Sequence, residues 1–339
     1  MKSYITDIKL AGKPVALYGM GNGAEKIISY LNYNGIEISC VFASESFVRG
    51  QSFMGMKVKT LAQTEEELGD FIIVTAFALE GNDTDIFRRL AGKHTLYAPN
   101  LPPYGEGCID ERWYNENKSK ADSVRNLLCD DISREIFDSL IEYNITADIN
   151  RLVGDDSAPE SWYDNRGVYI DVGAYDGDTV ISYAKKNPYY GEIYAFEPEK
   201  TAFRRLRKNT SSLGNVICIN STVWEKDGTI SFSGGKGRGS KIAEDGVETP
   251  CVSIDSFFKG KNVSGIKIDG EGADMEILKG AADIIYNNTP TLCVAVYHRA
   301  YDLFDIPLWL KRQNPSYKFY LRRREYVPAF DVFIYAVKK

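Results

Sequence analysis

The sequence has few of the residues that build metal centres and disulfide frameworks. Its 339 residues include two histidines, and its six cysteines are scattered without a C-x-x-C pair. A structural zinc site and a disulfide framework are therefore not expected. Cysteine usage of this kind is typical of a reduced, cytoplasmic protein.

A long apolar run is also missing. The longest one, at 71–79, contains Thr75 and is well short of the roughly 20 residues that a membrane-spanning helix needs. Asp7 and Lys9 stand where a signal peptide would have its apolar core. We therefore expect a soluble chain with no membrane span and no leader.

Neither sign of charge dominates. Lys and Arg number 41 against 47 Asp and Glu, which gives a formal net charge of −6. Since a mildly acidic protein has no overall attraction for phosphate polymers, we expect no nucleic acid partner. The apolar and charged fractions, 44% and 26%, are those of a globular protein and exclude disorder, collagen and coiled coil for the whole chain.

Strand and helix patterns alternate along the chain, which predicts an α/β protein. Proline and glycine gather at 99–107 and indicate a domain boundary. We expect an N-terminal α/β domain over residues 1–100, a helical connector over 101–160 and a second α/β domain over 161–339. In the second, the alternation predicts a doubly wound parallel sheet, and its last two strands should pair antiparallel because no helix pattern separates them.

The strongest motif is a glycine turn where the predicted strand 168–172 meets a predicted helix. It reads Asp171-Val172-Gly173-Ala174-Tyr175-Asp176-Gly177-Asp178-Thr179. Glycines there let a ligand approach the backbone, and the helix N-terminus offers free N–H groups. Glu197 ends the next strand, where a carboxylate can accept hydrogen bonds from both hydroxyls of a ribose. The alternative is that Glu197 caps a helix that we expect to begin at Pro198.

This turn with its later acid resembles a class I S-adenosylmethionine-dependent methyltransferase, and segments further along are similar to those of FkbM-type methyltransferases. Residues 266–274 (IKIDGEGAD) and 278–280 (LKG) are similar to that family's K-x-D-x-E-G-x-E…L-x-G pattern, with Asp274 in place of the usual Glu. Tyr297-His298 resembles a branch of the family. The resemblance covers residues 163–337. It implies a class I methyltransferase fold and transfer of a methyl group to a hydroxyl, with a sugar, a glycan or another small molecule as acceptor.

The candidate site residues fall at the ends of predicted strands, where ligands bind in open α/β sheets. For the cofactor S-adenosylmethionine we expect contacts from the glycine turn and the later strand ends: Asp171, Gly173, Tyr175, Gly177, Thr179, Glu197, Asn220 and Asp269. Asp269 and His298 are the candidates for a base that removes the hydroxyl proton. Histidine titrates near neutrality and needs no large pKa shift, whereas Asp269 needs burial or a neighbour. The structural alternatives are that Asp269 orders its turn and that His298 is a hydrogen-bonded core residue.

Several charged groups have two interpretations. Glu271, Asp274 and Asp302 could hold a hard cation, but we favour helix capping and solvated charge and expect no required metal. The basic glycine-rich segment at 234–241 is equally compatible with a lid and with a surface turn. The run Arg322-Arg323-Arg324 could bind an acidic substrate group, although a solvated strand end is the favoured interpretation.

The N-terminal domain has its own glycine motif. Gly19-x-Gly21-x-x-Ala24 follows a predicted strand and opens a predicted helix, as in the dinucleotide fingerprint, but the expected acid is misplaced because Glu45 is the nearest. The domain resembles Rossmann-like modules of sugar-modifying proteins. It could bind the nucleotide of an NAD(P)-linked enzyme, or serve packing, formation of a homodimer or substrate presentation. A third alternative for the chain is a non-catalytic scaffold, against which the intact glycines, Glu197 and Asp269 argue.

Overall fold

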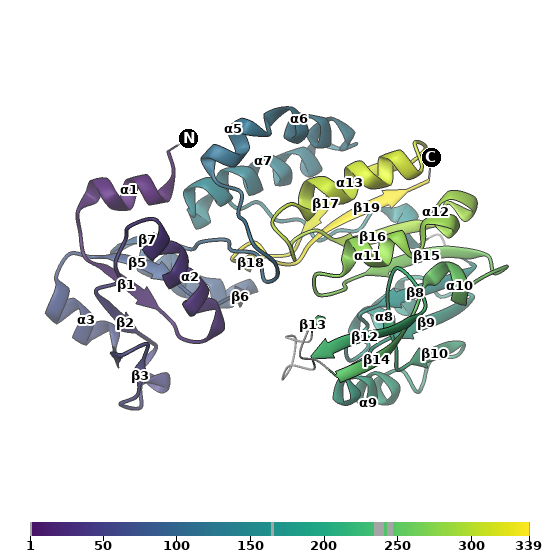
Figure 1. The fold of residues 1–339 in the computed structure, drawn as a ribbon, viewed down its shortest axis with the longest axis horizontal. Helices are drawn as coiled ribbons and strands as arrows, with labels where there is room; N and C mark the ends of the chain where they lie inside the picture. The colour runs from purple at the N-terminus through teal and green to yellow at the C-terminus, as the bar shows by residue number, and fades with distance from the viewer. Residues whose placement is uncertain (1, 164–165, 234–240, 243–246, 339) are drawn as a thin grey trace. The chain divides into compact units, whose positions relative to one another are not determined.

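The computed structural model describes residues 2–163, 166–233, 241–242 and 247–338, and the chain forms two compact units. Unit 1 comprises Met1–Asp122, Arg134–Asp156 and Arg323–Asp331, and unit 2 comprises Ser123–Ser133, Ser157–Arg322 and Val332–Lys339. Each unit is built from a sheet and helices (Figure 1). The domain limits predicted at residues 100 and 160 stay predictions, and the units differ from them in using discontinuous stretches of chain.

Unit 1 contains a six-stranded sheet in the order β3-β4-β2-β1-β5-β7, parallel except for β3. Its strands are β1 (Val15–Tyr18), β2 (Cys40–Phe42), β3 (Ser52–Phe53), β4 (Met56–Lys59), β5 (Ile72–Thr75) and β7 (Thr95–Tyr97). A separate antiparallel ribbon joins β6 (Leu79–Glu80) and β18 (Tyr326–Val327). The helices are α1 (Tyr4–Ala11), α2 (Asn22–Tyr33), α3 (Leu61–Leu68), α4 (Asp85–Ala91) and α5 (Glu111–Glu116), with α6 (Lys118–Leu127) and α7 (Asp131–Thr146) each extending past a limit of the unit. Short 3-10 turns are η1 (Glu45–Phe47), η2 (Gly81–Thr84) and η3 (Ile149–Arg151).

Residues 36–42 (IEISCVF) have the pattern of a β-branched strand, but β2 covers only the last three of them. Gly35 adopts a left-handed conformation, and the Ile36 N–H donates to the carbonyl of Leu31, so these residues close the end of α2. Strands β1 and β5 are buried along their whole length, as expected of strands covered on both faces. The sequence pattern therefore located the strand but not its start.

Unit 2 contains a seven-stranded sheet in the order β10-β9-β8-β15-β16-β19-β17. Its strands are β8 (Val168–Val172), β9 (Glu192–Phe196), β10 (Val216–Ile219), β15 (Val263–Ile268), β16 (Thr291–Ala295), β17 (Lys318–Arg323) and β19 (Val332–Val337). The first five in this spatial order run parallel from β10 to β16, and β19 runs antiparallel to β16. Strand order reverses beside β8, which confirms the α/β class predicted from the sequence.

Helices cover both faces of this sheet. They are α8 (Asp178–Lys186), α9 (Lys200–Asn209), α10 (Ile254–Phe257), α11 (Asp274–Lys279), α12 (Ala282–Asn288) and α13 (Asp302–Gln313), with the 3-10 turn η4 (Glu160–Tyr163). Figure 1 shows α11, α12 and α13 on the side away from α8 and α9. A smaller sheet, in the order β11-β14-β12-β13, comprises β11 (Thr222–Val223), β12 (Gly228–Ser233), β13 (Lys241–Ile242) and β14 (Val247–Val252). Its strands contribute to neither edge of the large sheet.

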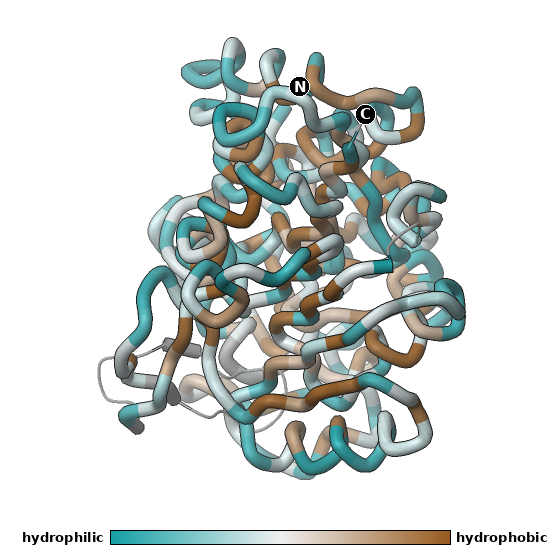
Figure 2. The backbone as a smooth tube through the Cα atoms, turned by 90° about the vertical axis from the view of Figure 1, so that its right-hand side faces the viewer, coloured by the Kyte–Doolittle hydropathy of each residue, from teal (hydrophilic) through white to brown (hydrophobic). Residues whose placement is uncertain are grey.

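An aromatic cluster anchors α8 to the large sheet. Tyr169 of β8 stacks on Tyr183 of α8 with ring centroids 3.7 Å apart, and Trp162 meets both rings edge-on. The cluster continues through Ile193 and Leu206, both fully buried. Figure 2 shows hydrophobic residues running along the central strands, with hydrophilic ones along the outer helices. Burial of these rings fixes the helix that follows the glycine turn.

Helix α9 begins two residues later than predicted. Lys200 is its first residue, and the Glu199 carboxylate accepts hydrogen bonds from the backbone N–H groups of Thr201 and Ala202. Pro198 therefore lies outside the helix, and the expectation that it is the first helical residue is wrong. The Glu199 side chain satisfies two N–H groups of the first helical turn, and this cap sets the start of α9.

The expectation of a solvated strand end at 322–324 is also wrong for two of the three arginines. Arg322 is 7% exposed: its Nη2 lies 2.7 Å from Asp130 Oδ2, its Nη1 donates to Ser133 Oγ, and its Nε donates to the carbonyl of Ser157. Arg323 is buried as well. Arg322 therefore ties two separate stretches of unit 2 together, 123–133 and 157–322.

In the part of the chain that the structure describes, no helix is both long enough and apolar enough to cross a membrane. The segment 234–240, for which a lid and a surface turn were weighed, lies outside the described residues.

Replacing Arg322 by Met should lower the free energy of unfolding by about 3 kcal/mol, because Asp130 and Ser133 lose a buried cationic donor. Burial raises the pKa of Asp130, but hydrogen bonds from Arg322 and Ser133 outweigh it and hold the pKa below its usual value. A lowered carboxyl pKa stabilises the fold at neutral pH and loses that contribution as the pH falls. Urea unfolding across the acidic range should therefore show a smaller pH dependence in the variant.

The matched control is Arg312→Met, which removes an exposed guanidinium from α13. Its unfolding free energy should stay within about 0.5 kcal/mol of the parent. Equal losses in the two variants would mean that the Arg322 network contributes nothing specific.

Candidate active site

The predicted site residues converge at the carboxyl ends of the strands in unit 2. Asp171 is the second-last residue of β8, Glu197 follows β9, Asn220 follows β10 and Asp269 follows β15, while His298 lies shortly after β16. Contacts join them in one chain from Asn220 through Glu197 and the glycine turn, and from there through Lys267 and Asp269 to His298. Five residues far apart in the sequence therefore share one edge of one sheet, as predicted.

A buried ion pair underlies this edge. Lys267 of β15 is the register partner of Asp171 of β8, and Lys267 Nζ lies 3.2 Å from Asp171 Oδ1. The other carboxylate oxygen accepts a 2.5 Å hydrogen bond from the Thr179 hydroxyl in the first turn of α8. Lys267 also donates to the carbonyl of Gly173. Asp171 is fully buried, and its contacts with Lys267 and Thr179 hold the turn in place.

The glycines of the turn are required by packing. Gly173 has φ +74°, and a Cβ atom there would lie 2.0 Å from the carbonyl oxygen of Asp269. Gly177 has φ +91° and is the N-cap of α8, and its Cβ would meet Leu206 and Thr210 of the α9 region. A side chain at either position would push the turn off the neighbouring strand or helix.

Glu197 lies where the turn crosses the end of β9. Its Oε2 accepts a 2.9 Å hydrogen bond from the Tyr175 N–H, and its Oε1 accepts one of 2.8 Å from the Glu199 N–H. Burial raises the pKa of Glu197, the two backbone hydrogen bonds lower it, and the outcome is a pKa of about 7. The Asn220 amide donates to the carbonyls of Glu197 and Pro198, which fixes this strand end from the side of β10.

His298 is enclosed by carboxylates. Its Nδ1 lies 2.8 Å from Asp274 Oδ2, and its Nε2 lies 3.3 Å from Asp269 Oδ1 and 3.7 Å from Glu271 Oε2. The imidazole is 1% exposed, whereas the Asp269 side chain is 25% exposed. Asp269 therefore stands between the buried imidazole and the outside of the cluster.

The carboxylates around His298 shift its pKa. Burial lowers the pKa of its imidazole, but Asp274, Asp269 and Glu271 together outweigh burial and raise it to about 9. His298 is therefore an imidazolium at neutral pH and has no free lone pair to take a proton. Its neighbours favour the charged form because each of them is a carboxylate.

Asp274 and Asp302 are not the solvated charges that the sequence suggested. Asp274 is 1% exposed, and its second oxygen accepts from the Gly270 N–H, so it fixes both the imidazole and the turn before α11. Burial, with Asp274 nearby, raises the pKa of Asp302 to about 7. Among the described residues, no group of three or more histidine, cysteine, aspartate or glutamate side chains is arranged to hold a metal ion.

Lys267 is the functional residue that sequence reasoning did not single out. The signal was present, because Lys267 interrupts an otherwise buried apolar strand at a position beside Asp171. A lysine that far inside a sheet needs a buried anionic partner. Burial lowers its pKa, but Asp171 and Asp269 outweigh burial and hold it above the usual range.

Packing explains one of the two glycines in the turn of unit 1. Gly19 and Gly21 have φ of +116° and +113°, and a Cβ atom on Gly19 would lie 2.6 Å from the ring of Phe77, whereas one on Gly21 would meet nothing within 4 Å. At the end of β2 the Ser44 hydroxyl shares a 2.7 Å hydrogen bond with the Tyr18 hydroxyl, and Glu45 is the nearest carboxylate in sequence. The end of β2 therefore has a hydroxyl pair where the dinucleotide fingerprint has an acid.

Residues 171–319 match the sequence profile of the methyltransferase FkbM domain. The structure of a methyltransferase FkbM from Methylobacillus flagellatus KT is similar over 96% of this chain and 90% of that chain, with a TM-score of 0.71 and 16% identity. None of the curated proteins matches the chain.

Two further solved structures are similar over about half of the chain. A precorrin-6y C5,15-methyltransferase from Geobacter metallireducens matches 52% of this chain and 81% of that chain (TM-score 0.33, 14% identity). Fibrillarin from Aeropyrum pernix, in complex with natively bound S-adenosyl-L-methionine, matches 51% and 67% (TM-score 0.34, 11% identity).

Replacing Lys267 by Met should lower the free energy of unfolding by about 3–5 kcal/mol, because it leaves the Asp171 carboxylate buried without a cation. Adding Asp171→Asn should restore a large part of this loss, since the amide carries no charge and still accepts from Thr179. Urea unfolding of the single and double variants measures both effects. A double variant no more stable than the single one would contradict a charge-based origin.

Proposed function

Since the chain contains an FkbM methyltransferase domain at residues 171–319, we propose that it transfers a methyl group from S-adenosylmethionine to a hydroxyl of a sugar or another small-molecule acceptor. The observation that carries this proposal is the Glu197 carboxylate, held at the end of β9 on the same sheet edge as the acidic cluster around His298.

Glu197 fits the ribose of the cofactor. Each of its oxygens takes one backbone hydrogen bond, and a carboxylate has about four acceptor positions, so both oxygens can still accept from ribose hydroxyls. The backbone of Gly173, Tyr175 and Gly177 forms the turn that the rest of the cofactor would contact, and the Asn220 side chain borders it. Asp171 and Thr179 contribute by holding that turn in place.

The charge of the cluster also suits a cationic ligand. Asp269, Glu271, Asp274 and Asp302 face His298, and the carboxylates outnumber the cations around it. S-adenosylmethionine carries a positive sulfonium, and when bound it supplies a methyl group that is already activated for transfer. The protein has to position the acceptor and exclude water.

We assign the proton acceptor for the hydroxyl to Asp269 and the role of a positioning residue to His298. Asp269 is the member of the pair that reaches the outside of the cluster, and the imidazolium of His298 lies 3.3 Å behind it. Asp274 holds the imidazole from the other side. This arrangement orients Asp269 for general-base catalysis.

The alternatives have less support. An NAD(P)-linked activity of unit 1 would need an acid at the end of β2, where Ser44 bonds Tyr18 instead. A scaffold without catalysis would not need a buried carboxylate with a pKa of about 7 at the end of β9. All six cysteines are free, which supports a place for the enzyme in the reducing cytoplasm.

Calorimetric titration with S-adenosylmethionine should give saturable binding that Glu197→Gln weakens by about tenfold or more. The carboxylate, not the carboxylic acid, accepts from both ribose hydroxyls, so affinity should fall as the pH drops through about 7, where Glu197 protonates. Below that pH the loss should approach about tenfold per pH unit, and the variant should lack this dependence.

Titration with NAD⁺ under the same conditions is the control. Saturable NAD⁺ binding without S-adenosylmethionine binding would place the ligand at residues 19–23 of unit 1 and would contradict the proposal.

Replacing Asp274 by Asn should lower the pKa of His298 from about 9 towards its ordinary value, because the imidazolium loses its closest anionic partner. The measurement is an NMR titration of the histidine side chains, which is simple because the chain has two histidines. His94→Gln assigns the signals. An unchanged His298 titration in the Asp274 variant would exclude this carboxylate as the source of the shift.

A further inference from the structure

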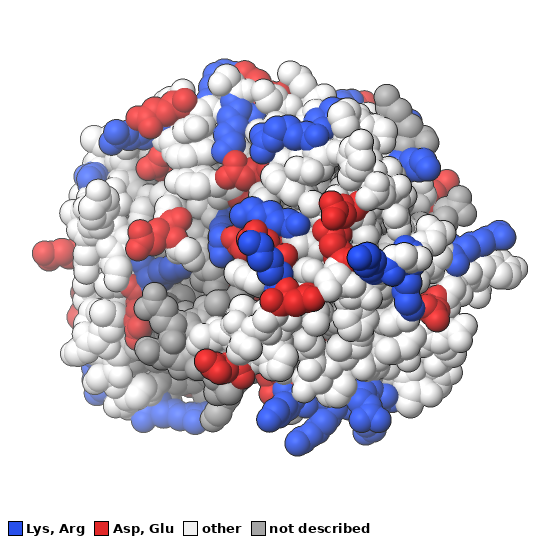
Figure 3. Space-filling model, turned by 45° about the vertical axis from the view of Figure 1, so that its right-hand side comes forward, with Lys and Arg blue, Asp and Glu red and all other residues white. Residues whose placement is uncertain are grey.

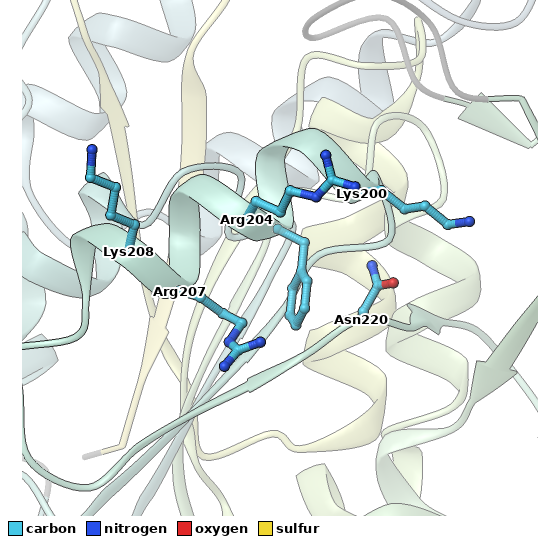
Figure 4. Close-up of a pocket in the computed structure, with 6 residues that line it drawn as sticks. Lys200, Arg204, Arg207, Lys208 and Asn220 are labelled. Carbon is cyan, nitrogen blue, oxygen red and sulfur yellow. The ribbon is translucent and has the colours of Figure 1, made fainter.

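A pocket of about 510 Å³ lies along α9, outside the cluster described above. Its lining comes from one face of the helix and from the end of β10: Lys200, Phe203, Arg204, Arg207, Lys208 and Asn220. Figure 4 shows the four cationic side chains leaving α9 and Asn220 coming from the neighbouring strand end. In Figure 3, most of the face shown mixes both signs, but Lys and Arg gather at its lower edge, the level of α9 in Figure 1.

The spacing of these cations lowers the stability of the helix itself. Lys200, Arg204 and Lys208 follow each other at intervals of four, so like charges are neighbours on one face, and such pairs destabilise an isolated helix. Lys200 is also the first helical residue, where the helix dipole disfavours a positive charge. Arg207 and Lys208 lie in the last turn, where the same dipole favours a positive charge. The dipole therefore explains two of the four cations that line the pocket.

No carboxylate offsets this charge within the described part of the chain, where none of these four side chains forms an ion pair. The remaining cation of α9, Arg205, does have partners. Its guanidinium lies 5.7 Å from the centroid of the Tyr175 ring, and its charge contributes to lowering the pKa of Glu199. A protein of net charge −6 thus holds four unneutralised cations around one pocket.

We propose that this pocket binds a small molecule that carries phosphate groups, of the class of diphosphate esters. Arginine pairs with phosphate oxygens through two parallel N–H donors, and lysine adds a point charge. The half-buried ring of Phe203 offers an apolar face for the ring of a base or sugar. The volume falls in the range of small-ligand pockets, and the overall negative charge disfavours a long polyanion.

The pocket borders the proposed cofactor site through Asn220. The same amide that lines the pocket donates a 2.8 Å hydrogen bond to the carbonyl of Glu197. The phosphate groups could come from a nucleotide-linked sugar or from a free polyphosphate anion. The site stands on the α9 contacts alone and does not require that S-adenosylmethionine be the cofactor.

Calorimetric titration of the full chain with inorganic pyrophosphate tests the site. We expect saturable binding that Lys200→Ala/Arg204→Ala weakens by about tenfold or more, since two charged contacts are removed. The matched control, Lys185→Ala/Lys259→Ala, removes two exposed lysines of the same unit that do not line the pocket. It should bind pyrophosphate like the parent, and thermal unfolding of both variants checks that they fold.

A second titration identifies the source of the phosphate. Displacement of pyrophosphate by a nucleoside diphosphate sugar would support a nucleotide-linked ligand, and pyrophosphate binding without displacement would support a free anion. Equal weakening in the pocket and control variants, or no saturable binding, would overturn the proposal. Tighter binding of single-stranded RNA than of either small molecule would overturn it in favour of a polymer. Because no arm uses S-adenosylmethionine, a failure here is distinct from a failure of the proposed methyl transfer.

Discussion

Lys267 and Asp171 meet between two central strands of the seven-stranded sheet, buried where neither charge would be stable alone. The two residues of the pair make three further contacts. Asp171 takes the hydroxyl of Thr179 and so holds the start of α8, while Lys267 holds the carbonyl of Gly173 and draws Asp269 to within 3.6 Å. The turn beside Glu197 and the carboxylate beside His298 are therefore positioned by one contact.

The rest of the site is arranged around this pair. Tyr175 can donate to Glu197 because Gly173 passes close to the carbonyl of Asp269, where no side chain would fit. On the other side of Lys267, Asp269 links the pair to His298. The result is an edge with a buried carboxylate of raised pKa, Glu197, at one end and the carboxylate–imidazolium cluster of His298 at the other.

The placement of Asp171, Glu197, Asn220 and Asp269 was predictable because each ends a strand that the apolar pattern locates, and parallel strands end at the same edge. Other features depend on contacts between segments far apart in sequence. The raised pKa of His298 needs carboxylates from the turn after β15, and the burial of Arg322 needs Asp130. The start of α9 was missed for a local reason, since a cap by Glu199 outweighed the usual preference for proline.

The discontinuity of unit 2 has a consequence for how such a chain can arise. Arg322 needs Asp130 and Ser133, which lie on a stretch that the sequence separates from the methyltransferase domain by residues 134–156 of unit 1. A segment that begins after residue 133 would lack both partners. The sequence of unit 2 can therefore be exchanged with its Arg322 network intact only if the exchanged segment begins before Asp130 and carries residues 134–156 with it.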